Sequence, residues 1–297
     1  MMAAAGRGCC PALAGPNTSR PARTFARRSG LWAALILILV APARGQSDEP
    51  AAFAQGYEAY QRGDFATAAR RWRSLAESGD ARAQYNLGVL YVEGRVGPRD
   101  PRKAVYWWRL AAAQGHVRAA HNLGLTLIGG EGGLRDYAEA ARWLSRAAEQ
   151  GFPNSEYSLG KLYAAGLGVT RDEARAVELY QRAARQGFAP AAYNLGKAYR
   201  DGRGVGPDLE KAVGWFRRAA AAGYGPAQRN LASRLARGDG AARDDVEALV
   251  WALLAERQKT AGAAHLVEVL RGRLSATAAG EAQARARAFV PRTADDE

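Results

Sequence analysis

Small and apolar residues recur along this chain with a period of 36 residues, as from Leu87 to Leu123. In each period a Leu-Gly pair comes first, and an aspartate, an alanine and a bulky side chain follow in that order. A strict period in this range is typical of stacked supersecondary units, none of which can bury its apolar face alone. The pair stands at Leu87/Gly88, Leu123/Gly124, Leu159/Gly160 and Leu195/Gly196, and Leu231/Ala232 closes the series.

The spacing of apolar residues within a period predicts two helices. Leu87, Leu90 and Tyr91 have the i, i+3, i+4 spacing of one buried helical stripe, which predicts an A helix around the Leu-Gly pair. A B helix of similar length follows the aspartate. Glycine inside a helix costs about 1 kcal/mol relative to alanine. We expect close approach of the neighbouring helix at Gly88 to offset this cost, because only a missing side chain leaves room for it.

Glycine-rich loops join the two helices, as in Gly202-Arg203-Gly204-Val205. A glycine after the A helix can adopt a positive φ and end it, and the recurring aspartate can cap the B helix by accepting backbone N–H groups. The loops at residues 94–97 and 130–133 depart from this pattern, so we expect them to differ in shape. The expected capping aspartates are Asp100, Asp136, Asp172, Asp208 and Asp244.

The periods define the organisation of the chain. Residues 51–79 form an atypical first helix pair with a shorter loop, and the last full unit departs from the pattern, as a terminal unit should. Residues 260–290 are predicted to form two capping helices, the second capped by Ser275 and stopped by Pro291, before an acidic tail at 291–297. Five full units within 80–259 span residues 80–115, 116–151, 152–187, 188–223 and 224–259.

The best-preserved unit, Ala191 to Gly223, reads A-x-x-N-L-G-x-x-Y-x-x-G-x-G-V-x-x-D-x-x-K-A-x-x-W-[FY]-x-x-A-A-x-x-G. This pattern resembles the Sel-one-like repeat family, relatives of the tetratricopeptide α/α repeats with a longer loop between the helices. The resemblance covers roughly residues 51–290. It implies an all-α, right-handed α/α solenoid of 36-residue helix-pair repeats with N- and C-terminal capping helices and a concave surface lined by the A helices. It also implies a scaffold or adaptor, and exported bacterial members act in envelope roles.

The N-terminal residues predict an export signal. Residues 31–41 form an apolar run that follows several arginines and is shorter than the roughly 20 residues of a membrane span. Ala41-Pro42-Ala43 offers a cleavage site, so we expect residues 1–45 to be a signal peptide and the mature protein to be periplasmic or secreted. The alternative is an uncleaved anchor in the inner membrane. Both cysteines, Cys9 and Cys10, fall in this segment, which excludes disulfides and thiol chemistry from the mature chain.

The charge of the chain is partly a property of this leader. The formal net charge is +13, but the first 46 residues hold six arginines and no acid, which leaves 42 − 6 = 36 basic residues against 29 acidic ones. The remaining arginines are mixed with acidic residues on the B helices, which is typical of a solvated face. We therefore expect no nucleic-acid partner.

The chain offers no candidate for catalysis, a metal or a cofactor. His116 and His121 are five residues apart, so they do not share a helix face, and each occupies a position of the period that is aromatic in other units. We interpret both as packing residues. No phosphate loop, G-x-S-x-G or H-E-x-x-H motif is present, which predicts a non-enzyme without a cofactor.

The A helices carry the candidate partner-binding residues. Asparagine recurs one residue before the Leu-Gly leucine, and it can bond either the backbone of a bound peptide or, as we favour, a neighbouring element of the array. Basic residues replace apolar ones at nearby positions in the later units, so we expect the surface to turn from apolar to basic. The candidates are Asn86, Asn122, Lys161, Asn194, Lys197, Arg200, Asn230 and Arg237.

These features predict a non-catalytic adaptor that binds a segment of a partner protein in a concave groove. A segment with an apolar part followed by an acidic part would match the expected change along the surface. The alternative is direct binding of an envelope polysaccharide or peptidoglycan through the basic groove and the tryptophans. The sequence predicts inter-unit packing for most tryptophans, because they recur in register on the B helices, and this disfavours the alternative.

Overall fold

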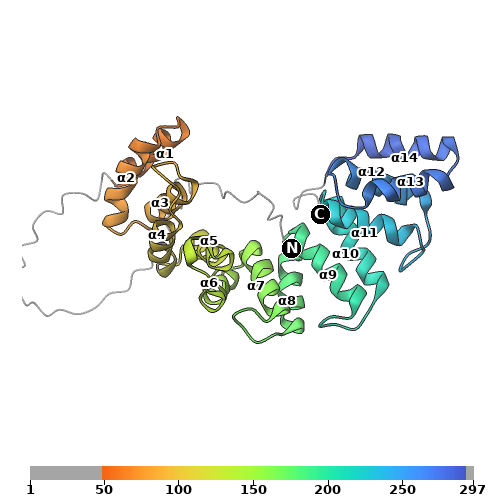
Figure 1. Cartoon of the computed structure of the whole chain (residues 1–297), viewed down its shortest axis with the longest axis horizontal. Helices are drawn as coiled ribbons and strands as arrows, with labels where there is room; N and C mark the ends of the chain where they lie inside the picture. The colour runs from red at the N-terminus through yellow and green to blue at the C-terminus, as the bar shows by residue number, and fades with distance from the viewer. Residues whose placement is uncertain (1–48, 292–297) are drawn as a thin grey trace, which may run out of the picture. The chain divides into compact units, whose positions relative to one another are not determined.

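The computed structural model describes residues 49–291, so the predicted export signal (1–45) and residues 292–297 of the acidic tail lie outside the described residues. The described chain is helical, with fourteen α-helices, one short 3-10 helix and no strand in this range (Figure 1). It divides into two compact units, with the boundary after Ala119.

The first unit contains two helix pairs. Helices α1 (Glu49–Gln61) and α2 (Phe65–Glu77) form the atypical first pair, and α3 (Ala81–Glu93) and α4 (Pro101–Ala113) form the next. Within each pair the helices lie side by side, and α2 also packs on α3 (Figure 1). Helix α5 (Val117–Gly129) begins at the end of this unit and continues into the second one.

The second unit continues the pattern of paired helices. Consecutive helices from α6 to α12 pack on one another, and α13 and α14 both pack on α12 (Figure 1). This arrangement confirms the predicted all-α solenoid of helix pairs. The helices are α6 (Tyr137–Glu149), α7 (Pro153–Ala165), α8 (Glu173–Arg185), α9 (Ala189–Asp201), α10 (Leu209–Ala221), α11 (Gly225–Leu235), α12 (Asp245–Arg257), α13 (Ala263–Arg273) and α14 (Ala276–Ala288).

The predicted caps are present. Each recurring aspartate precedes a B helix and accepts the N–H three residues on, as Asp208 accepts from Lys211 at 2.9 Å. Ser275 caps α14 in the same way. The predicted difference of the loop at 130–133 is also confirmed, because residues 131–133 form a 3-10 helix where the later units have a turn. The aspartates that cap B helices are Asp64, Asp100, Asp136, Asp172, Asp208 and Asp244.

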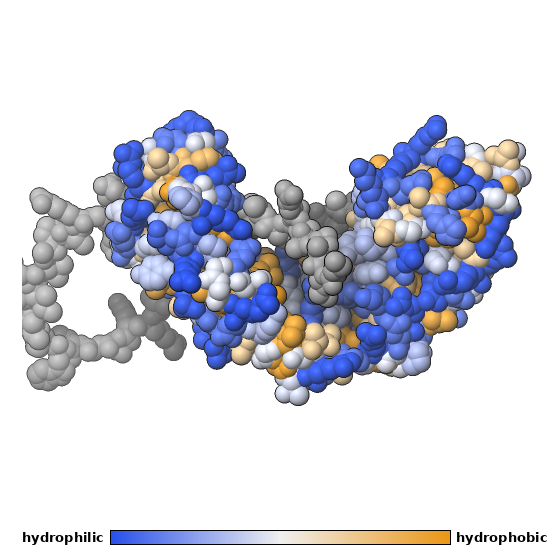
Figure 2. Space-filling model, in the orientation of Figure 1, coloured by the Kyte–Doolittle hydropathy of each residue, from blue (hydrophilic) through white to orange (hydrophobic). Residues whose placement is uncertain are grey.

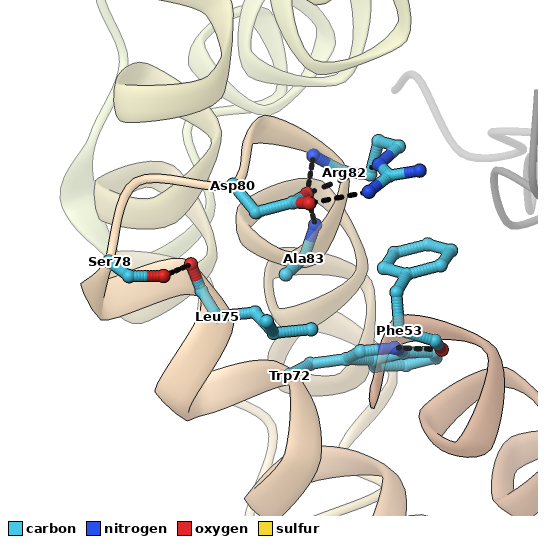
Figure 3. A network of polar contacts seen from close by, with 7 residues as sticks. All are labelled: Phe53, Trp72, Leu75, Ser78, Asp80, Arg82 and Ala83. Carbon is cyan, nitrogen blue, oxygen red and sulfur yellow. Dashed lines mark hydrogen bonds and ion pairs between the residues drawn. The ribbon is translucent and has the colours of Figure 1, made fainter. Parts of the chain in front are cut away.

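An aspartate also caps the first regular A helix. Asp80 accepts the backbone N–H groups of Arg82 at 2.8 Å and Ala83 at 2.9 Å, and it pairs with the Arg82 guanidinium at 2.6 Å (Figure 3). The same guanidinium lies 4.4 Å from the centroid of the Phe53 ring. In Figure 3 the Trp72 indole donates to the backbone carbonyl of Phe53. These contacts join α1, α2 and α3.

The A-helix glycines allow the close approach that the sequence predicts. A Cβ on Gly196 would lie 2.7 Å from the Phe216 ring, which is fully buried. A Cβ on Gly88 would lie 2.2 Å from the indole of Trp108. In the last pair the glycine becomes Ala232, and the position that faces it in the period becomes Ala252. The bulk added to one helix is thus matched by bulk removed from the other.

A second glycine joins successive pairs. Gly204 has φ +69°, and a Cβ there would lie 2.2 Å from the carbonyl oxygen of Glu173, at the start of the preceding B helix. Gly168 and Gly240 make the same approach to Tyr137 and Leu209. In these three pairs the loop therefore rests directly on backbone of the pair before it.

The C-terminal helices bury the last B helix. Most of α12 is buried, including Val250 and Leu254 on a face that the other B helices leave to solvent. On the face that Figure 2 shows, hydrophilic residues predominate and apolar residues gather in small patches. Between residues 49 and 291, none of the helices combines the length and the apolar character needed to cross a membrane.

Gly196→Ala should lower stability and Gly214→Ala should raise it. Both residues lie in the pair α9–α10, but a Cβ at position 196 meets the Phe216 ring, whereas a Cβ at position 214 meets nothing within 4 Å. Overpacking of a full core costs about 1–3 kcal/mol, and an exposed Gly→Ala exchange in a helix gains up to about 1 kcal/mol. Thermal and urea unfolding followed by circular dichroism measure both. Equal shifts for the two variants would contradict the close-approach explanation.

Candidate functional site

A cleft in the second unit brings together three of the residues that the sequence singles out. It has a volume of about 450 Å³ and is lined mainly by α7, α8 and α9. Lys161 comes from α7, and Asn194 and Lys197 come from α9. Four tyrosines line the cleft with them, namely Tyr157, Tyr180, Tyr193 and Tyr224.

The tyrosines form a packed aromatic wall. The ring centroid of Tyr157 lies 5.9 Å from that of Tyr180, and the Tyr193 centroid lies 5.4 Å from that of Tyr224. Burial raises the pKa of Tyr157, Tyr180 and Tyr224, although hydrogen bonding to Asn194 opposes part of the shift at Tyr157 and Tyr180. These three hydroxyls are therefore neutral at physiological pH and can both donate and accept hydrogen bonds.

The two lysines lie over the rings of this wall. The Lys161 Nζ atom is 5.6 Å from the centroid of Tyr157, and the Lys197 Nζ atom is 5.6 Å from the centroid of Tyr193. Burial lowers the pKa of Lys197, and the positive charge of nearby Arg200 adds to the shift. An ammonium group within about 6 Å of an aromatic centroid is attracted to the ring face. The pairs recur because each lysine follows its tyrosine by four residues, one helical turn.

The cleft has a net positive charge. Its carboxylates are already paired with arginines, since Asp201 accepts two hydrogen bonds from Arg200 at 2.6 and 2.8 Å and Glu173 pairs with Arg171. In the part of the chain that the structure describes, neither lysine of the cleft has a carboxylate within ion-pair distance. Three cations line the cleft, Lys161, Lys197 and Arg203, against the two carboxylates of Glu173 and Asp201, which gives 3 − 2 = +1. The arginines that pair with the two carboxylates, Arg171 and Arg200, add positive charge beside the lining.

One asparagine of the A helices bonds to a tyrosine of the preceding helix pair. Asn230 donates to the hydroxyl of Tyr193 at 3.3 Å and to the Pro226 carbonyl at 2.9 Å. Asn194, at the equivalent position, lowers the pKa of Tyr157, 37 residues earlier. The interpretation that the asparagines bond neighbouring elements is therefore confirmed at Asn230.

The first asparagine lacks this partner. Asn86 is fully buried, and neither its amide nitrogen nor its oxygen has a hydrogen-bond partner. Phe53 of α1 is the counterpart of Tyr85, with the register shifted by the shorter first loop. The Phe53 carbonyl accepts a hydrogen bond from the Trp72 indole, as the Tyr85 carbonyl accepts one from the Trp108 indole. Phenylalanine carries no hydroxyl to offer Asn86.

Several other predicted site residues do not offer free polar groups. Asn86 and Asn122 are buried, so the prediction that they face an accessible surface is wrong. Arg200 and Arg237 are accessible but are held by Asp201 and Asp239. The structure thus concentrates the predicted site on Lys161, Asn194 and Lys197, and it adds the tyrosines, which the sequence marked only as recurring packing positions.

The histidines pack, as the sequence predicts. His116 stacks on Tyr85 with the centroids 4.6 Å apart, and its Nδ1 accepts the Ala119 N–H at the start of α5. His121 is buried, and its Nδ1 lies 2.9 Å from the Ser155 hydroxyl. Burial lowers the pKa of each histidine to about 4. Within residues 49–291 no cluster of histidine and acidic side chains could hold a metal ion.

The tryptophans on the B helices of the second unit are not open platforms for a sugar ring. Trp143 and Trp215 are half-buried, and the guanidinium groups of Arg146 and Arg218 lie 4.7 and 5.2 Å from their ring centroids. Trp251 packs edge-on against Phe289. The accessible chemistry of the second unit is therefore the cationic, tyrosine-lined cleft, which can bind an anionic ligand with apolar surface.

Phe53→Tyr should stabilise the first unit by about 1 kcal/mol, because a tyrosine hydroxyl can satisfy the buried amide of Asn86. The measurement is the urea midpoint of the variant. In a chain that also carries Asn86→Ala, Phe53→Tyr should not raise the urea midpoint. The four proteins form a double-mutant cycle that isolates the interaction of residue 53 with Asn86. A gain of equal size in both backgrounds would rule out the missing hydrogen bond.

Acid should destabilise the fold through its histidines. The folded pKa of each of these two histidines, about 4, lies below its value in the unfolded chain. The free energy of unfolding is therefore unaffected by the histidine above about pH 6.5, and it falls as the pH drops toward 4, because the unfolded state takes up the proton first. His121→Tyr with Ser155→Ala restores the residues that the other units carry and removes one of the two groups. Urea unfolding between pH 7.5 and 4.5, a range that covers most of this titration, should show a shallower loss for the variant. Parallel curves would contradict the assignment.

Comparison with known proteins supports the fold across most of the chain. A protective antigen of uropathogenic Escherichia coli strains that displays an SLR fold is 28% identical with a TM-score of 0.75. The match covers 84% of this chain and 54% of that one, so it spans about half of the antigen. A Sel1 repeat protein from Oxalobacter formigenes is 31% identical with a TM-score of 0.65, over 69% of this chain and 84% of the other. The comparison with curated proteins found no match.

The repeat pattern matches a family model over more than half of the chain. The model is described as Sel1 repeat, and each match begins one residue after a unit counted from the sequence. The matched residues are 81–116, 117–152, 153–188, 189–224 and 225–259. The chain therefore belongs to the Sel1 repeat family, whose members are generally non-catalytic scaffolds for protein–protein interaction.

Proposed function

We propose that this protein is a periplasmic or secreted adaptor without catalytic activity, which binds an acidic segment of a partner protein in the cleft between α7, α8 and α9. The observation that carries the proposal is the pair of lysines over tyrosine rings, Lys161 over Tyr157 and Lys197 over Tyr193. Export rests on the N-terminal sequence, in which an apolar run follows several arginines and precedes a small-residue cleavage site.

The spacing of the lysines suits an extended chain. Lys161 and Lys197 occupy equivalent positions of successive helix pairs, so one ligand crossing both pairs meets the same tyrosine-lysine surface twice. Asn194, the third predicted residue in the cleft, follows Tyr193 directly in the chain, and its amide lowers the pKa of Tyr157. A peptide with acidic side chains and some apolar surface complements this repeated pattern.

The positive charge acts mainly on recognition and association rate. Both carboxylates of the cleft are held by arginines, so an incoming carboxylate meets the lysines without a competing anion. Complementary charge at an accessible surface accelerates association and weakens with salt. Aromatic walls then supply apolar contact area at low entropic cost, because tyrosine has few rotatable bonds.

Lys161→Glu with Lys197→Glu should abolish partner binding. The variant replaces both ammonium groups of the cleft with carboxylates, which repel an acidic segment. The matched control is Arg142→Glu with Lys211→Glu, which changes the net charge by the same amount at exposed positions that do not line the cleft. Each form is used to retain proteins from an envelope extract, and the binding segment of a retained protein is mapped with synthetic peptides.

The proposal expects a protein that the wild type and the control retain and the lysine variant loses, with acidic residues in its mapped segment. Retention of the same proteins by all three forms would refute the cleft as the binding site. Enrichment of glycan without protein would instead support binding of an envelope polysaccharide or peptidoglycan.

A further inference from the structure

Helix α4 carries an apolar stripe on its solvent-facing side. Tyr106 is 56% exposed and Leu110 is 38% exposed, which places two large apolar side chains four residues apart on one helix face. The half-buried Trp107 joins them, with its ring centroid 5.0 Å from that of Tyr106 at an interplanar angle of 75°. We call Tyr106, Trp107 and Leu110 the α4 stripe. Exposed apolar clusters of this kind mark interaction surfaces more often than single apolar residues do.

The equivalent positions of the other regular B helices show that this stripe is not required by the repeat. In α6 and α10, a tryptophan stands at the Trp107 position and an arginine at the Leu110 position. The guanidinium group of this arginine lies over the tryptophan ring. At the Leu110 position three helices carry arginine, which keeps the face hydrophilic. The residue pairs equivalent to Tyr106 and Leu110 are Arg142/Arg146, Glu178/Arg182, Gly214/Arg218 and Val250/Leu254.

Only the last of these pairs is apolar at both positions, and there the chain covers it. Val250 and Leu254 are 6% and 5% exposed, because α13 and α14 pack on α12. Trp251, the counterpart of Trp107, contacts the Phe289 ring with the centroids 5.5 Å apart. Helix α14 brings an alanine-rich face to this contact, with Ala282 and Ala286 fully buried. The chain itself therefore shows what fits this face of a B helix, namely a small-residue amphipathic helix.

The charges around the α4 stripe select the kind of helix. Helix α4 carries three cations, Arg102, Lys103 and Arg109, against one carboxylate at its start, that of the cap Asp100, which pairs with Lys103 at 3.3 Å. Helix α14 carries two arginines in its last turn, so α14 of a second copy would meet like charge. From the apolar stripe, its covered counterpart on α12 and this charge, we propose that α4 is a docking surface for an acidic amphipathic α-helix of a partner protein. This surface shares no residue with the cleft of the second unit.

A helical peptide derived from α14 tests the proposal. The probe is residues 275–290 with Arg285→Glu and Arg287→Glu, held helical by a side-chain staple on its polar face, and the reference is the same stapled peptide with both arginines. Binding to the full chain is measured by fluorescence anisotropy. We expect the acidic peptide to bind at least about tenfold more tightly than the basic one, a difference of about 1.4 kcal/mol.

Variants of the stripe locate the binding. Tyr106→Arg with Leu110→Arg introduces the residues of α6 and should weaken the acidic peptide at least about tenfold, although it adds positive charge. Tyr106→Ala with Leu110→Ala should act in the same direction without any change of charge, and circular dichroism confirms that each variant is folded. Gly214→Arg, at the position equivalent to Tyr106 on α10, should leave the affinity unchanged. Failure of the acidic peptide to bind, or equal binding by the stripe variants, overturns the proposal.

Discussion

The close contact between a glycine on each A helix and a large side chain on its B helix is the constraint on which the array depends. Because Gly88, Gly124, Gly160 and Gly196 have no Cβ, the facing side chain of the B helix contacts the A-helix backbone, and the two helices pack closely. The glycine costs helix propensity at every repeat, so the contact must be favourable enough to offset it. Its counterpart between pairs is the loop glycine, where Gly204 lies on the Glu173 carbonyl and sets how one pair rests on the previous one.

Where one unit departs from the pattern, a neighbouring residue departs with it. Ala232 replaces the helix glycine, and Ala252 replaces the large side chain that would face it. His121 replaces a tyrosine and bonds Ser155, which is alanine in the other units. The pair of Phe53 and Asn86 lacks such an adjustment, and there a buried amide is left without a partner.

The same compensation explains a buried carboxylate in α7. Gln84 and Gln228 donate from their amides to the carbonyls of Ala76 and Ala220, eight residues earlier. Glu156 stands at this position in α7, and its side chain has no N–H group to donate to the carbonyl of Ala148. Arg182 donates to the Ala148 carbonyl at 2.6 Å instead and pairs with Glu156 at 2.7 Å. Burial raises the pKa of Glu156 while Arg182 opposes the shift, so the pair replaces one glutamine with two charged groups.

The fold could be predicted from the sequence, because a 36-residue period with a glycine facing a large side chain is typical of stacked helix pairs, and its caps and loop breaks are local. The sequence also singled out Lys161 and Lys197, since lysine replaces the apolar Val89 and Leu125 of the earlier units. Tertiary structure alone decided which of the recurring polar residues are accessible. Asn86 and Asn122 lie inside the array and Asn194 lines a cleft, although all three share one position, because accessibility depends on what the adjacent pair places against it. The α4 stripe likewise became visible only when the cover on α12 showed how an equivalent face is buried.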